Sequence, residues 1–92
     1  MSVTAAHIIV RGRVHGVGFR DFTSGAARSL ELTGTVRNLK DGTVQVHVEG
    51  DRNLIEKLVA RLEAGPPSAR VTAVEVSWLP ATGRHSRFTV EY

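Results

Sequence analysis

The sequence contains no cysteine, and ten of its twelve basic residues are arginine, so lysine is scarce. Without cysteine there can be no disulfide framework, no thiolate catalysis and no thiolate metal site, and the fold must rest on its hydrophobic core alone. No run approaches the roughly 18 apolar residues of a membrane helix, and residues 1–6 lack the pattern of a signal peptide. We therefore expect a cytoplasmic protein without a membrane partner.

The length of 92 residues predicts one domain that spans residues 1–92. A hydrophobic share of 41% against 23% charged residues is too apolar for a disordered chain. The formal charge of +3 comes almost entirely from guanidinium groups, whose planar fork suits phosphate or carboxylate. This balance is compatible with an anionic ligand, although scattered surface arginines would give the same count.

Hydrophobic periodicity predicts five strands and two helices. The strands are expected at 7–14, 35–39, 43–49, 71–79 and 88–92, and the helices at 22–32 and 50–64. The order βαββαβ with a further C-terminal strand is typical of an α+β, ferredoxin-like fold, in which two helices cover one face of a mainly antiparallel sheet.

Three local features add detail to the predicted helices and strands. Asp21 or Thr23 can cap the start of the first helix. Lys40-Asp41-Gly42 lies between two alternating runs and predicts a hairpin turn. The alternation after it predicts a strand with one buried face, of Val44, Val46 and Val48, and one wet face, of Thr43, Gln45, His47 and Glu49.

The segment that joins the first strand to the first helix is where we expect chemistry. Gly16 and Gly18 allow positive φ, which turns several amide N–H groups inward, and the following helix start adds the positive end of its dipole. Arg20 at the edge of such a nest can bind a phosphoryl group bidentately. Known nucleotide-binding loops do not fit, because the Walker A lysine is missing and Asp21 stands where the dinucleotide motif needs glycine. A glycine-rich turn beside a surface arginine remains the structural alternative.

Two longer patterns resemble the signatures of the acylphosphatase family. They are Val10-x-Gly-x-Val-His-Gly-Val-Gly-Phe-Arg20 and Gly34-Thr-Val-Arg-Asn38-x3-Gly42-x-Val44-x5-Gly50. The predicted element order and the ending Phe88-x-Val90-x-Tyr92 extend the resemblance over essentially the whole chain. The resemblance implies a ferredoxin-like enzyme that hydrolyses the carboxyl-phosphate bond of acylphosphates to carboxylate and inorganic phosphate, without metal or cofactor.

The resemblance also implies roles for individual residues. Arg20 and Asn38 would be catalytic, with Asn38 positioning the attacking water. The phosphoryl oxygens would be bound by Arg20 and by the loop residues His15, Gly16, Val17, Gly18 and Phe19. Two positions depart from the family pattern, because His15 replaces a usual glutamine and Thr35 a usual aromatic residue. We expect His15 to contribute mainly backbone, whereas Thr35 leaves either the sheet packing or the site wall altered.

The chemistry of these residues agrees with hydrolysis. A carboxylate leaves without protonation, so no general acid is required. The transition state of phosphoryl transfer spreads its charge over three equatorial oxygens, which a cradle of amides and one guanidinium can stabilise. A neutral amide at position 38 can hold water without repelling the phosphate, although Asn38 could instead bond to its own turn. The four histidines lie far apart in the sequence, so no metal site is predicted.

Two other functions are compatible with parts of the sequence. Nucleic-acid binding fits the basic character, yet the sequence has only five aromatic residues and no RNP1 motif, so no nucleic-acid partner is expected. The second alternative function is a non-catalytic module that binds phosphate or carbamoyl phosphate, as in hydrogenase-maturation proteins. The presence of both Arg20 and Asn38 favours hydrolysis. We expect a monomer that acts on a small-molecule acylphosphate and releases inorganic phosphate.

Overall fold

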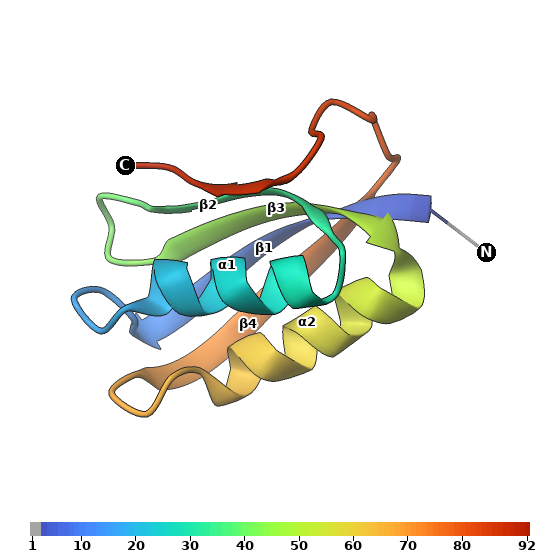
Figure 1. Cartoon of the computed structure of the whole chain (residues 1–92). Coiled ribbons are helices and arrows are strands. Elements are labelled where there is room, and N and C mark those ends of the chain that lie inside the picture. The colour runs from blue at the N-terminus through green and yellow to red at the C-terminus, as the bar shows by residue number, and fades with distance from the viewer. Residues whose placement is uncertain (1–2) are drawn as a thin grey trace.

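The computed structural model describes residues 3–92 as a five-stranded sheet with two helices packed on one face (Figure 1). The elements are β1 (Val3–Arg13), α1 (Phe19–Ser29), β2 (Thr33–Asn38), β3 (Val44–Asp51), α2 (Arg52–Ala64), β4 (Arg70–Leu79) and β5 (Phe88–Val90). The strand order is β4-β1-β3-β2-β5, and only the β2–β5 pair is parallel. The predicted α+β, ferredoxin-like fold is therefore confirmed.

The core lies between the sheet and the helices. Valines at every second position of β3 are fully buried, and they face the buried residues of β1 through the pairs Ile8 with Val46 and Val10 with Val44. Ile55, Leu58 and Leu62 of α2 recur every three or four residues and pack onto this surface as one helix face. β3 and α2 thus bury the faces that their hydrophobic periods predict. Within residues 3–92, no helix is both long and apolar enough to cross a membrane.

The first helix begins three residues earlier than predicted, and neither proposed cap is its N-cap. The N-cap is Gly18, which has a φ of 76° and makes no side-chain cap bond. Asp21 lies inside the first turn, and Thr23 donates its hydroxyl hydrogen to the carbonyl of Phe19, one turn earlier. The early start is explained by Phe19, which is only 2% exposed and opens the buried face of the helix.

The wet face predicted for residues 43–49 is wrong at Thr43, which is 5% exposed, and at Glu49, which is 4% exposed. The segment 80–87 covers Glu49, because this segment connects β4 to β5 at opposite edges of the sheet and must cross the strands between them. The Glu49 carboxylate accepts hydrogen bonds from the Thr82 amide and hydroxyl and from the Gly83 amide. Burial alone would raise the pKa of Glu49, but the hydrogen bonds from Thr82, Gly83 and His47 outweigh it and lower the pKa to about 2.

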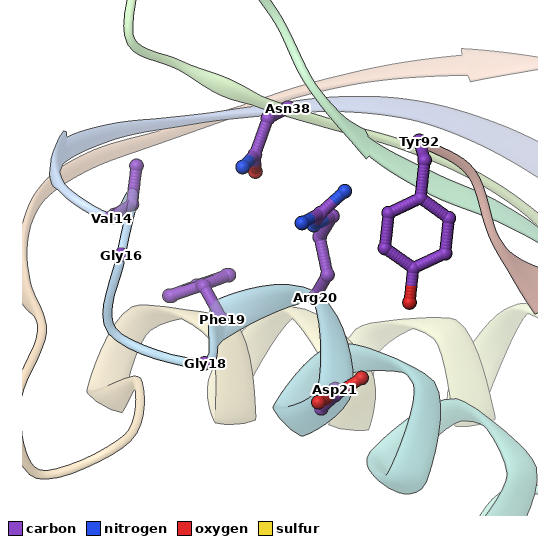
Figure 2. Close-up of a pocket in the computed structure, with 8 residues that line it drawn as sticks. All are labelled: Val14, Gly16, Gly18, Phe19, Arg20, Asp21, Asn38 and Tyr92. Carbon is purple, nitrogen blue, oxygen red and sulfur yellow. The ribbon is translucent and has the colours of Figure 1, made fainter.

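The last strand is shorter than predicted and brings the end of the described chain to the tip of β2. β5 ends at Val90, which pairs with Val36, and the Glu91 amide then donates to the Val36 carbonyl at 2.8 Å. Tyr92 follows, is 97% exposed, and lies beside Arg20 (Figure 2). The parallel β2–β5 pairing therefore brings Tyr92 and Asn38, which are distant in sequence, to the same pocket.

Candidate active site

A small pocket of about 120 Å³ lies where the loop after β1, the first turn of α1, the end of β2 and Tyr92 meet (Figure 2). The residues that line it are Val14, Gly16, Gly18, Phe19, Arg20, Asp21, Asn38 and Tyr92. Both sequence patterns contribute to it, since the first supplies the loop and Arg20 and the second supplies Asn38. The β1–β3–β2 arrangement of the sheet is what brings the two patterns together.

The loop has the backbone geometry that its glycines predict. Gly16 has a φ of 70° and Gly18 a φ of 76°, in the left-handed region that other residues rarely adopt. A Cβ atom added at either position would meet no other atom within 4 Å, so glycine is required here by conformation and not by space. The first amides of α1 have no carbonyl acceptor within the helix, and the helix dipole makes this end positive. This side of the pocket is suited to an anion.

Arg20 is held by the C-terminal segment. Its Nη1 group donates to the Glu91 carbonyl at 3.1 Å, and its guanidinium carbon lies 4.5 Å from the centre of the Tyr92 ring. A cation over an aromatic face is attracted by the ring quadrupole. These two contacts orient the guanidinium and use few of its five N–H donors, so the others can bind a ligand.

Asn38 lines the pocket and carries an acceptor that no hydrogen bond satisfies. Its Oδ1 atom is buried and has no hydrogen-bond partner. Figure 2 shows the amide group projecting from β2 into the space between the loop and Arg20. A buried polar atom without a partner costs on the order of 1–3 kcal/mol and is usually satisfied by water or ligand. The alternative that Asn38 bonds to its own turn is not observed for this oxygen.

His15 and Val17 differ from the other loop residues that the sequence singled out, since neither lines the pocket. The Nε2 atom of His15 lies 2.8 Å from the backbone carbonyl oxygen of Thr43, to which it donates a hydrogen bond. Val17 is partly buried against the hydrophobic core. Gly16, Gly18 and Phe19 do line the pocket, with Phe19 also anchored in the core.

Three lining residues were not predicted. Val14 follows the bulge in β1 and is also buried in the core. The sequence predicts Asp21 only as a helix cap. Tyr92 belongs to the C-terminal pattern, but its place over Arg20 depends on the parallel pairing of β5 with β2, which the local sequence does not show.

Two further predictions concern positions outside the pocket. Thr35 lies in the middle of β2, paired with His47 and Thr89, and does not line the pocket. Its departure from the family pattern therefore affects the sheet and not the site wall. Across residues 3–92, no three metal-ligating side chains are grouped closely enough to hold an ion.

The sequence matches the acylphosphatase family over residues 6–90. An acylphosphatase of Pelotomaculum thermopropionicum is 46% identical over 92 residues, which is the full length of both chains. The crystal structure of an acylphosphatase from Bacillus subtilis superposes with a TM-score of 0.93 at 37% identity and covers 97% of this chain and 99% of that one. Full-length HypF in its phosphate- and nucleotide-bound form gives a TM-score of 0.85 at 26% identity, over 99% of this chain but only 12% of HypF.

Proposed function

Because the chain belongs to the acylphosphatase family and is an enzyme that hydrolyses acylphosphates, we propose that the pocket at the start of α1 is its active site. The reaction converts an acylphosphate and water to a carboxylate and inorganic phosphate. Both the family and the activity agree with what the two motifs imply. The roles that we assign to individual residues are part of this proposal.

The buried, unpartnered Oδ1 atom of Asn38 carries the proposal. A water molecule that donates a hydrogen to this oxygen would satisfy it and would turn a lone pair toward a phosphoryl group bound at Arg20. Since the amide is neutral, it can hold the water without repelling the phosphate. Asn38 is therefore assigned the positioning of the attacking water.

Arg20 and the loop are assigned the phosphoryl oxygens. The transition state carries its charge on three equatorial oxygens, which amides and one guanidinium can contact together. Arg20 is already oriented by Glu91 and Tyr92, so little reorganisation is needed when the substrate binds. The leaving carboxylate needs no proton, and the mechanism therefore assigns no general acid to Asp21.

The test compares Arg20 and Asn38 variants by phosphate release from benzoyl phosphate and by inhibition with inorganic phosphate. Arg20→Ala should lose phosphate affinity and turnover together, and Arg20→Lys should also fail, since a point charge does not reproduce a bidentate fork. Asn38→Ala should keep the phosphate inhibition constant while kcat falls by roughly a hundredfold.

Three outcomes would count against these assignments. Loss of phosphate affinity in Asn38→Ala equal to that in Arg20→Ala, or full turnover in Asn38→Ala, would remove the water-positioning role. A wild-type chain that binds phosphate without turnover would favour the binding-module alternative. Circular dichroism of each variant controls for folding.

We further propose that residues 1–92 act as one domain, as a monomer and in the cytoplasm. One chain supplies every residue that lines the pocket, so catalysis does not require a second copy. Analytical ultracentrifugation would check the monomer, and cell fractionation would check the location.

A further inference from the structure

We infer that a groove between α1 and β5 binds the acyl part of the substrate and favours acyl groups that carry a second negative charge. This inference rests on the proposed function of the neighbouring pocket. The groove has a volume of about 620 Å³. Its lining residues are Asp21, Ser24, Gly25, Arg28, Arg87, Thr89, Val90 and Tyr92.

The groove continues directly from the proposed active site. Asp21 and Tyr92 line both spaces, whereas Asn38 lines only the pocket. In Figure 2, Asp21 lies on the far side of Arg20 from Asn38. An in-line displacement needs the attacking water and the leaving group on opposite sides of the phosphorus atom. A leaving carboxylate that departs away from Asn38 is therefore directed toward the groove.

The charges of the groove select the acyl group. Arg28 and Arg87 contribute two positive charges, against one carboxylate from Asp21 at the junction with the pocket. Arg28 donates from Nε and Nη2 to the Phe88 carbonyl at 3.1 and 3.0 Å, which fixes its guanidinium against β5 and leaves Nη1 available. Arg87 is exposed and lines the same groove. A carboxylate or phosphate on the acyl chain would meet these two guanidinium groups.

A matched pair of substrates isolates this effect. Butanoyl phosphate and 3-carboxypropanoyl phosphate have the same chain length and differ in a terminal methyl or carboxylate group. The wild-type enzyme should show a higher kcat/KM for the carboxylated substrate. Arg87→Ala should lower that value about two- to fivefold, the scale of a partly exposed ion pair, and should leave butanoyl phosphate unchanged.

Arg61→Ala is the matched control, because it removes the same charge from α2 and lines neither space. This variant should leave kcat/KM unchanged for both substrates. Arg28→Gln, which keeps a donor for Phe88, should repeat the selective loss seen in Arg87→Ala.

The results separate the groove from the reaction itself. Equal kcat/KM values for the two substrates, with no selective effect of Arg87→Ala or Arg28→Gln, would overturn the groove while leaving the proposed active site intact. An equal loss for both substrates in these variants would also overturn it, because the arginines would then act on the phosphoryl group or on the fold. No hydrolysis of either substrate by the wild-type chain would overturn the proposed function and the groove together.

Discussion

His15 donates a hydrogen bond from Nε2 to the backbone carbonyl oxygen of Thr43 at a distance of 2.8 Å. The same carbonyl accepts from the Leu39 amide at 2.9 Å, directly after Asn38 in the chain. The bond therefore ties the glycine loop to the hairpin that carries Asn38. This bond fixes the distance between the glycine loop, which we assign to the phosphate, and Asn38, which we assign to the water.

The first prediction is that His15 is a positioning residue. His15→Ala should lower kcat roughly tenfold with little change in the phosphate inhibition constant. The loop would keep its own geometry, but its position relative to Asn38 would no longer be fixed. His15→Gln should restore kcat, since its side-chain amide can donate to the same carbonyl. If the glutamine variant were as slow as the alanine variant, the bond to Thr43 would not be the cause.

The second prediction concerns the conformation of Gly18. Gly18→Val should weaken phosphate inhibition and lower the free energy of unfolding by about 1–3 kcal/mol, because a β-branched residue opposes a φ of 76°. Gly18→Asn should retain most of the phosphate inhibition and most of the free energy of unfolding, since asparagine tolerates the left-handed region and is a favoured N-cap. Urea unfolding and phosphate inhibition measure the two effects. A folded valine variant with unchanged phosphate inhibition would show that the loop is an ordinary turn and does not bind phosphate.

The third prediction is that the free energy of unfolding depends on the ionisation of Glu49. Its folded pKa of about 2 lies below the ordinary value of 4.5, so the stabilisation is complete above pH 4.5 and is lost as the pH falls toward 2. Between pH 6 and pH 3 this group should account for a loss of about 2 kcal/mol. In Glu49→Gln the loss over this range should be smaller by that amount. An identical pH dependence in the variant and the wild type would contradict the assignment.

The fourth prediction is that hydrolysis does not depend on a divalent metal. The charge stabilisation that we assign to Arg20 and the loop amides requires no ion. Dialysis against EDTA should leave kcat unchanged, and added magnesium should not raise it. Loss of activity on chelation and its recovery with magnesium would show that the Arg20 mechanism is incomplete.

Local patterns predicted the strands and the conformation of the glycine loop, because each depends on near neighbours in the chain. Alternating valines make β3 identifiable, and two glycines before a helix make the loop identifiable. The burial of Glu49 and the place of Tyr92 over Arg20 were not predictable in this way. Both depend on where the segment after β4 crosses the sheet, which is a property of the whole topology.

The parallel pairing of β5 with β2 also has a kinetic consequence. Ile8 in the middle of β1 pairs with Val46 of β3 on one side and with Val76 of β4 on the other. After β4, at one edge of the sheet, the chain crosses to β5 at the other edge. Contacts between distant segments are slow to form, because loop closure costs entropy before any contact repays it. Arg20 receives its partners Glu91 and Tyr92 from this last segment. During refolding, catalytic activity should therefore return no earlier than the docking of β5, even if the helices and the central hairpin form much sooner.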